Sequence, residues 1–382
     1  WGVGVKYLLS PDAYITADYQ ADFFSSRYNF LNASKTYKTQ PGDELVRKRT
    51  RNQQANVKGI FNLGERNKVS VGVEYLADML SSPTENISHK TAYTAAIFAQ
   101  DEITITRQLR ALAGVRYLYH EFFKSYATPN VALMYGQGGL NLRASYAAGF
   151  RTPTLSELYA SETTKAVDRI TIGNLNLKPE KSDYFSLNAE YAHSRFTVST
   201  NIFYNRIRDM IDYRTIATGE EAKQKYGHEE VRQRDNVYKA EVRGINVAAQ
   251  AYLGAGFRIG AGYTHLDTKD DETGQPIDKS LRNAANINAQ WSRTWGGYTM
   301  NVYLNGRINS ERFSKTYGYA PAYQVWDLNT RHTFSLRSVI LEPGVGIENL
   351  FNYTDDRPYN FNYATLTPGR SVYVSLSIKF KG

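Results

Sequence analysis

The sequence lacks cysteine entirely and contains no long apolar run. Without cysteine, a disulfide framework and thiolate metal sites are excluded. No stretch approaches the roughly 18 consecutive apolar residues that a membrane-spanning helix requires, so a hydropathy scan alone would indicate a soluble chain. A transmembrane β-barrel stays compatible with this composition, because its strands alternate lipid-facing and lumen-facing residues. The net charge of +9 over 382 residues is not clustered, which argues against a nucleic-acid partner.

Patterns that carry catalytic or metal chemistry are also scarce. The histidines show no HxxxH or HExxH spacing; they are His89, His120, His193, His228, His265 and His332. Ser156 stands beside Glu157 without the G-x-S-x-G context of a nucleophile. The acidic stretch at residues 267 to 280, DTKDDETGQPIDKS, lacks the ordered ligand pattern of a calcium loop, and a solvated loop explains it better. The sequence therefore predicts no enzyme, no cofactor and no metal site.

Long stretches of alternating apolar and polar residues are present instead, and tyrosine occurs 30 times. In SVYVSLSIKF, residues 371 to 380, one strand face holds Val372, Val374, Leu376, Ile378 and Phe380. The other face holds Tyr373, Ser375, Ser377 and Lys379. Similar alternation recurs in segments of about ten residues or more, the length that a tilted strand needs to cross a bilayer. We therefore predict an all-β fold, a transmembrane antiparallel β-barrel whose apolar faces meet lipid.

Short turns and long loops alternate along the chain. Turns such as LGERN and GQGG contrast with longer polar and aromatic connections at residues 28 to 48, 79 to 91, 150 to 180, 210 to 237, 267 to 280, 309 to 321 and 354 to 368. This alternation is typical of outer-membrane barrels, and it gives about seventeen strands in one barrel domain over residues 1 to 382. Because bacterial single-chain barrels have even strand counts, we expect an odd number of strands before Trp1.

Three segments resemble one known family. GFRTPTLSELY at 149 to 159, followed by GNLNLKPEKS, is similar to the "FRAP…NPNL" region of TonB-dependent outer-membrane receptors. The segment GIENLFNYTDDRPYNFNYATLTPGRSVYVSLSIKF, 346 to 380, resembles the C-terminal part of these receptors. AAIFAQDEITITRQLRALAGVRYLYH, 95 to 120, resembles a hairpin in the middle of their barrel. The three resemblances occur in the family's order.

The resemblance implies a 22-stranded barrel occluded by an N-terminal plug, with the plug and about five strands preceding this sequence. It also implies a place in the bacterial outer membrane, contact with its lipid, and energised uptake through the TonB complex, which would bind the missing N-terminal region. The implied ligand is an iron chelate, either a ferric siderophore or haem. Alternatives are a receptor of the same family for cobalamin or another nutrient, and a passive porin-like barrel.

Outer-loop residues are the candidates for ligand contact. Tyrosine rings stack on a planar ligand and hydrogen bond its polar groups, and cationic side chains favour an anionic chelate. The predicted ligand-binding residues are Arg151, Tyr159, Tyr213, Tyr226, His228, Tyr317, Tyr319, Tyr359 and Tyr363. For Arg151, anchoring the loop to the barrel wall is an equal alternative. Haem needs an axial ligand, and residues 154 to 172 contain no histidine, so a ferric siderophore is the first choice and haem the second.

The incomplete barrel carries a further expectation. Strands near residues 2 to 9 and 370 to 380 should be edges with unpaired backbone groups. Helix should be nearly absent, against roughly a third in ordinary globular proteins.

Overall fold

The computed structural model describes residues 1–34, 38–164, 167–271, 273–278, 280–314, 318–355 and 368–381. Its strands are β1 (Gly2–Ser10), β2 (Ala13–Asn29), β3 (Glu44–Leu63), β4 (Asn67–Ser82), β5 (Ile87–Thr104), β6 (Leu109–His120), β7 (Lys124–Gln137), β8 (Leu140–Arg151), β9 (Ser161–Thr164), β10 (Arg169–Ile172), β11 (Glu180–Ala192), β12 (Phe196–Thr218), β13 (Glu230–Gly254), β14 (Phe257–Asp270), β15 (Asn283–Trp295), β16 (Tyr298–Asn309), β17 (Arg312–Ser314), β18 (Gly318–Ala320), β19 (Tyr323–Ser335), β20 (Val339–Glu348) and β21 (Ser371–Phe380). Four of them, β9, β10, β17 and β18, have three or four residues. The other seventeen described strands have nine or more, which matches the strand number predicted from the sequence.

Helix is nearly absent from the described residues, as predicted. The helical segments are η1 (Pro83–Glu85), α1 (Leu155–Tyr159) and α2 (Gly219–Tyr226), of three, five and eight residues. No helix in the described part of the chain combines the length and the apolar character that crossing a membrane would require.

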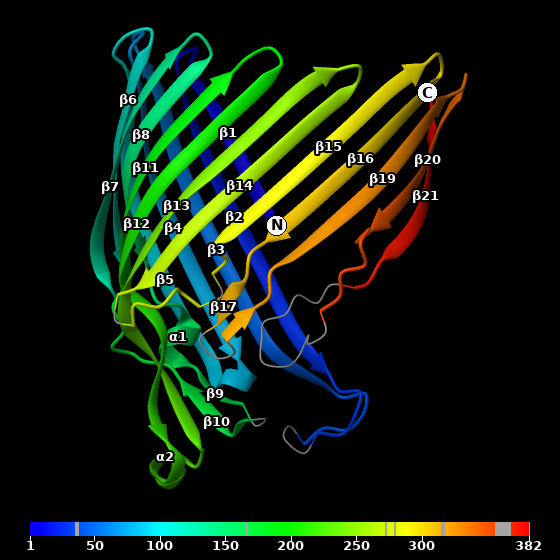
Figure 1. The fold of residues 1–382 in the computed structure, drawn as a ribbon. Coiled ribbons are helices and arrows are strands. Elements are labelled where there is room, and N and C mark those ends of the chain that lie inside the picture. The colour runs from blue at the N-terminus through cyan, green and yellow to red at the C-terminus, as the bar shows by residue number, and fades with distance from the viewer. Residues whose placement is uncertain are drawn as a thin grey trace. The chain divides into compact units, whose positions relative to one another are not determined.

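The chain divides into two compact units. The first contains residues 1–133, 145–184 and 206–239, and the second contains residues 134–144, 185–205 and 240–382. In the first unit, β1 to β6 pair consecutively and antiparallel (Figure 1). In the second, β13 to β16 and then β19 to β21 do the same. One short parallel pairing, between β10 and β13, departs from the antiparallel rule.

In the first unit, the apolar face of the strands is exposed, whereas in a water-soluble β-sandwich it would be buried. Along β3 to β6, Val57, Val73, Ile97 and Tyr117 are cross-strand neighbours on one face, and all four are exposed. Residues one position along point to the other face, where Glu74 pairs with Arg116. The apolar face of these strands therefore lies on the outside, which is the reverse of a water-soluble β-sandwich.

Aromatic rings gather at the short-turn end of the second unit. Trp295 stacks on Tyr298 with ring centroids 5.8 Å apart, and Tyr298 stacks on Phe334 at 4.9 Å. Trp291 lies 5.9 Å from Trp295. Such a band of Trp and Tyr is typical of the interface between hydrocarbon and water in membrane barrels.

Strand β21 follows the predicted alternation. The Tyr373 hydroxyl donates a hydrogen bond to Asn329 at 2.8 Å, and Lys379 forms an ion pair with Glu342 at 2.6 Å. Tyr373 lies opposite Gly346, where a Cβ atom would come within 2.3 Å of the tyrosine ring. The alternate residues are apolar and strongly exposed: Val372, Val374, Leu376, Ile378 and Phe380. Contact of this face with lipid stays a prediction.

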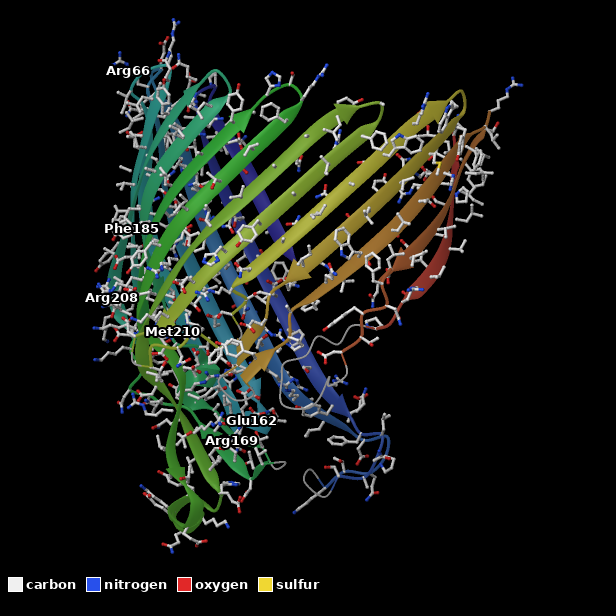
Figure 2. The ribbon with its side chains drawn as sticks, in the orientation of Figure 1. Arg66, Glu162, Arg169, Phe185, Arg208 and Met210 are labelled. Atoms are coloured by element: carbon white, nitrogen blue, oxygen red, sulfur yellow. The ribbon has the colours of Figure 1, made fainter. Side chains whose placement is uncertain are left out.

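The long strands of the first unit form a wall. Beyond one end of this wall lie short elements, here called the loop layer. Figure 1 shows α1, α2 and the β9–β10 hairpin at one end of the strands. Glu162 and Arg169, on the two strands of that hairpin, lie at this end, whereas Arg66, in the turn between β3 and β4, lies at the other (Figure 2). The buried apolar clusters of the described residues all lie in this layer or at the strand ends beside it.

The strands at both chain ends have one partner each. β1 pairs with β2, and β21 pairs with β20, with no second partner among the described strands. Hydrocarbon does not tolerate unpaired backbone groups. We therefore expect the 382-residue chain, expressed by itself, neither to insert stably into membranes nor to transport. Heat-modifiable migration on a gel, which reports a closed barrel, would contradict this expectation.

Candidate ligand site in the loop layer

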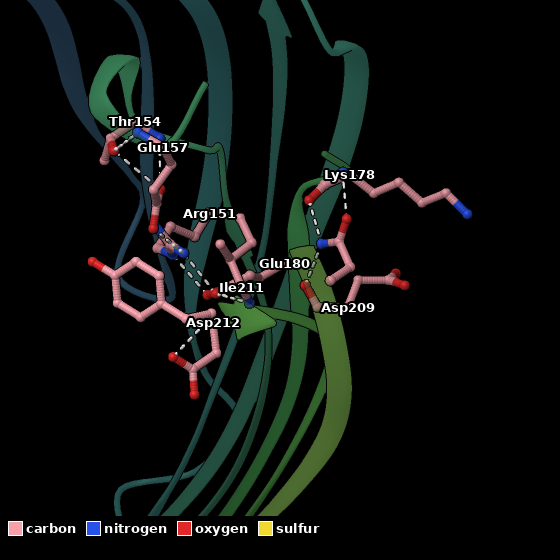
Figure 3. Close-up of polar contacts among 10 residues, drawn as sticks. Arg151, Thr154, Glu157, Lys178, Glu180, Asp209, Ile211 and Asp212 are labelled. Carbon is pink, nitrogen blue, oxygen red and sulfur yellow. Dashed lines mark hydrogen bonds and ion pairs between the residues drawn. The ribbon is translucent and has the colours of Figure 1, made fainter. Parts of the chain in front are cut away.

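Arg151 is the centre of a polar cluster that joins four elements of the first unit (Figure 3). It is the last residue of β8, and its guanidinium meets Glu180, the first residue of β11. Its Nε and Nη2 each donate to a different Glu180 oxygen at 2.6 Å. Its Nη1 and Nη2 donate to Glu157 of α1 at 3.0 and 3.3 Å. The backbone N–H of Ile211 in β12 donates to Glu180 at 2.8 Å.

This geometry favours the structural alternative for Arg151. Two carboxylates more than offset its single positive charge, and the side chains of Glu157 and Glu180 are only 12% and 16% exposed. A bidentate pair between Arg and a carboxylate also fixes orientation. The cluster therefore ties the loop that follows β8 to β11 and β12, and ligand contact by Arg151 stays an untested prediction.

Helix α1 begins with a capping box. The Thr154 hydroxyl accepts a hydrogen bond from the Glu157 N–H at 3.2 Å, and the Glu157 carboxylate accepts one from the Thr154 N–H at 2.8 Å. A helix of five residues is too short to be stable alone. It is held because Leu155 and Leu158 are buried in two apolar clusters, and because Arg151 donates to the same Glu157 carboxylate.

The charge of Glu157 makes α1 sensitive to acid. Burial acts to raise the pKa of the Glu157 carboxyl, but hydrogen bonds from Arg151 and Thr154 outweigh burial and leave the pKa below its ordinary value of 4.5. The carboxylate therefore stabilises α1 above pH 4.5, and this stabilisation is lost as pH falls through the lowered folded pKa. We expect the Leu158 and Ala160 amides, which donate within this turn, to lose exchange protection in that range. The variant Glu157→Gln should show low protection with no such transition, and a transition that persists in it would contradict the assignment.

A second cluster fixes the segment before β11 (Figure 3). The Lys178 N–H donates to the Asn236 side-chain oxygen at 2.7 Å. The Asn236 amide group donates in turn to the carbonyls of Lys178 and Asp209, at 2.9 and 2.7 Å. Leu177, immediately before, is 4% exposed and packs with Leu158. The two quoted motifs, GFRTPTLSELY and GNLNLKPEKS, thus pack on each other and on the extensions of β12 and β13.

Tyr213 combines an exposed ring with a cation. It is 42% exposed, and the Arg234 guanidinium carbon lies 3.6 Å from its ring centroid. An Arg234 Nη2 also donates to the Tyr213 hydroxyl. Tyr213 lies in β12 and Arg234 in β13, so the pair joins the two strands beyond the wall. An aromatic plane beside a guanidinium is a surface that suits a planar, anionic ligand.

Tyr159 is more deeply set. Its ring packs against the clusters that contain Leu80 and Leu158, and the Lys90 ammonium lies 4.4 Å from the ring centroid. Tyr159 therefore supports α1 while presenting a second pairing of a ring with a cation. Five of the predicted ligand-binding residues lie in the first unit. Among them, Tyr159 has Lys90 of β5 over its ring and Tyr213 has Arg234 of β13 over its ring.

His228 and Tyr226 lie at the far end of the same unit. His228 Nδ1 lies 2.9 Å from the Asp168 carboxylate, which also accepts from the Glu229 N–H. The hydrogen bond with His228 lowers the pKa of the Asp168 carboxyl. Tyr226 packs against the cluster of Ala217, Ala222 and Val231. The arrangement joins α2 to the β9–β10 hairpin and gives both residues a structural role.

The remaining candidates lie elsewhere. Tyr319, in β18 of the second unit, is 55% exposed, and its ring centroid lies 5.3 Å from that of Phe313. It lines a pocket of about 290 Å³ together with Lys269 and Arg282. Tyr317, Tyr359 and Tyr363 fall outside the described residues.

One expectation about the loops was wrong. Residues 210 to 237 were expected to form a long loop, but β12 continues to Thr218, α2 follows, and β13 starts at Glu230. Ion pairs hold this extension: Glu230 binds Arg169 and Arg232, each at 2.6 Å. The apolar residues of the extension, such as Ile211, Ala217 and Val231, do not fall at regular alternate positions, so period-two alternation gives no signal there. In EVRQRD, charged residues stand at every second position, Glu230, Arg232 and Arg234, and this spacing was the available sign of a strand. Arg234, which the sequence analysis did not select, belongs to this pattern.

Comparisons with known proteins agree with this architecture. A family model described as TonB dependent receptor-like, beta-barrel matches residues 1–350. The probable TonB-dependent siderophore receptor PiuA of Acinetobacter baumannii is 22% identical over 328 residues, which cover 76% of this chain and 41% of PiuA. The probable hemoglobin and hemoglobin-haptoglobin-binding protein 4 of Haemophilus influenzae is 30% identical over 120 residues, which cover 30% of this chain and 12% of that protein.

Among solved structures, a mutant of the ferric enterobactin receptor PfeA of Pseudomonas aeruginosa superposes with a TM-score of 0.78 at 20% identity. The match covers 97% of this chain and 59% of the PfeA chain. At this identity the likeness shows a common fold. The chain spans less than two thirds of the length of each of these proteins.

Proposed function

The chain belongs to the TonB-dependent receptor-like β-barrel family, and from that premise we propose that it forms the wall and loops of an outer-membrane uptake receptor for an iron chelate. Energy would come from the TonB complex. A ferric siderophore is the first choice of cargo and haem the second. The observation that carries the proposal is the family match over residues 1–350.

Membrane placement is supported by the exposed faces of the strands. The outward residues along the middle of β3 to β6, such as Val57, Val73 and Ile97, and the outward residues of β21 are apolar, and water-exposed apolar patches of that extent are unfavourable in a soluble protein. The aromatic band around Trp295 and Tyr298 lies at the short-turn end of the second unit. In a bilayer, both features become stabilising.

The chemistry of the loop layer supports an anionic, partly planar cargo. Tyr213 with Arg234, and Tyr159 with Lys90, each offer a ring beside a cation. Phenolate and carboxylate iron chelates have this combination of charge and flat surface. The ion pairs of Arg151 with Glu157 and Glu180 favour a bracing role at α1 over direct contact with the cargo.

Haem ranks second for two reasons. Residues 154 to 172 contain no histidine, and His228, which is 20% exposed, has its Nδ1 bonded to Asp168, so only its Nε2 is available for an axial role. The siderophore receptor PiuA also matches 76% of this chain, against 30% for the hemoglobin-binding relative.

The deciding experiment is binding of ferric siderophores and of haem to the full-length receptor. We expect a ferric siderophore to bind and Tyr213→Ala to weaken it about fivefold to tenfold, the loss of one stacking contact. His228→Ala should leave siderophore binding unchanged. Tyr252→Ala is the matched control, because Tyr252 is 48% exposed but lies beside the short turn after β13.

Three outcomes would change the proposal. A Soret shift on haem binding that His228→Ala abolishes would put haem first. Failure to bind any iron chelate would leave cobalamin or another nutrient. Uptake that continues in cells without TonB would favour the passive porin-like alternative.

A further inference from the structure

An apolar groove crosses the outer face of β3 to β6 in the first unit. It encloses about 470 Å³. Its shape follows from residue size, because Ala55, Tyr75, Ala95 and Tyr119 are successive cross-strand neighbours. Small alanines between large tyrosines leave a hollow. Its floor continues over Val57, Val73 and Ile97, which are exposed.

Two arginines lie above this groove on the same face of β3. Arg51 and Arg49 precede Ala55 by four and six residues, on the loop side of the groove, so all three side chains point to one face. At about 3.4 Å per residue, Arg51 lies roughly 14 Å along the strand from Ala55. Because strands in such walls are tilted by about 45°, the groove lies roughly 10 Å deeper in the bilayer than Arg51.

Both arginines lack a carboxylate partner among the described residues. The cross-strand neighbours of Arg51 are Phe23 and Met79, and those of Arg49 are Ser25 and Ser81. The Arg51 guanidinium lies 5.0 Å from the Phe23 ring centroid. Its Nε is buried without a hydrogen-bond partner in the described part of the chain. A guanidinium held among apolar and hydroxyl groups favours an anionic partner.

A ladder of tyrosines runs from the rim of the groove toward the arginines, because Tyr75 and Tyr119 line the groove and Tyr93 lies two residues from Ala95 on the loop side. Tyr75 and Tyr93 lie 6.2 Å apart between ring centroids, and Tyr93 and Tyr119 lie 6.3 Å apart. Tyrosine prefers the depth where hydrocarbon meets headgroups. The order along the face is therefore an apolar groove, an interfacial ladder and then cations, which is the order of parts in an anionic lipid.

We propose that this face holds one phosphate-bearing acyl lipid, with an acyl chain in the Ala55–Ala95 groove and the phosphate at Arg49 and Arg51. The separation fits, since a depth of about 10 Å lies within one leaflet of a hydrocarbon core about 30 Å thick. The inference rests on the proposed membrane placement, and it is independent of which chelate the loops bind.

The test is native mass spectrometry of the full-length receptor with phosphatidic acid and with diacylglycerol of the same acyl chains. We expect one phosphatidic acid to stay bound at collision energies that remove diacylglycerol. The double variant Arg49→Gln with Arg51→Gln should lower phosphatidic acid occupancy about tenfold, as expected for lost charge-assisted hydrogen bonds. Ala95→Phe fills the groove with both arginines intact and should lower it as well.

Arg66→Gln is the matched control, because Arg66 is exposed in the turn at the other end of β3 and should leave occupancy unchanged. Equal retention of the two lipids, or full phosphatidic acid retention in the double variant, would overturn the proposal. Chelate binding is measured on the same samples and should be unaffected by these substitutions. If no sample binds an iron chelate but phosphatidic acid is retained as expected, the proposal of an iron-chelate cargo is contradicted and the proposal of a lipid site is supported.

Discussion

Arg151→Ala is expected to open the loop layer of the first unit while leaving its wall strands paired. The substitution leaves Glu157 and Glu180, both largely buried, without their cation. Loss of one partner from a buried charge cluster costs about 3 to 5 kcal/mol. Because the Arg151 side chain is 42% exposed, solvent screening reduces the expected loss of local stability to about 2 to 3 kcal/mol.

The measurement is limited proteolysis together with hydrogen exchange of residues 152 to 180. We expect cleavage within this segment and faster exchange of the Ile211 amide, which donates to Glu180. Arg208→Ala is the matched control, because Arg208 makes one ion pair, with Asp183 at 2.6 Å, and is 46% exposed. A similar response to both substitutions would contradict a special role for the Arg151 cluster.

The same variant separates the two roles predicted for Arg151. If Arg151 braces the loop, chelate affinity falls together with protection of residues 152 to 180. If it contacts ligand directly, affinity falls while proteolysis and exchange stay at wild-type values. Arg151→Lys sharpens the distinction, because lysine keeps the charge but not the bidentate geometry.

Gly173→Ala is expected to have an effect of comparable size on the same layer. A Cβ atom at residue 173 would lie 2.6 Å from the carbonyl carbon and oxygen of Leu158 and 2.8 Å from the Tyr159 nitrogen. These are backbone atoms, so no side chain can turn aside, and the Gly173 N–H bond to the Ala160 carbonyl at 2.7 Å would stretch. Overpacking of this kind costs about 1 to 3 kcal/mol.

Protease sensitivity and chelate binding report this effect. We expect cleavage between α1 and β11 and a loss of chelate affinity, because Tyr159 shifts with the helix end. Gly4→Ala is the control, since the nearest contact of a Cβ atom there is 3.8 Å, to the Asp18 side chain. Wild-type protease resistance in Gly173→Ala would show that the two segments are not packed as described.

Prediction from the sequence succeeded for features that neighbouring residues determine. Period-two alternation identified β21 and its two faces, and the turn residues gave the strand number. Prediction failed where the apolar residues of a strand are few and irregularly spaced, as in the extensions of β12 and β13 around Glu230. It was also blind to pairings between distant segments, because nothing in the residues near Tyr213 indicates that Arg234 lies over its ring. Arg151 shows the intermediate case, since its type suggested two roles and only its partners favour one.

The buried apolar clusters of the described residues belong to the loop layer and its junction with the strands, not to the strand faces. Folding of the first unit is thereby split between two solvents. In the membrane placement proposed above, backbone pairing in lipid assembles the wall, whereas burial of Leu155, Leu158 and Val231 away from water assembles the loops. Sequence change in one part is therefore largely decoupled from the other. In the proposed receptor, substitutions in the loop layer would therefore change the ligand surface while the wall keeps the same strand register.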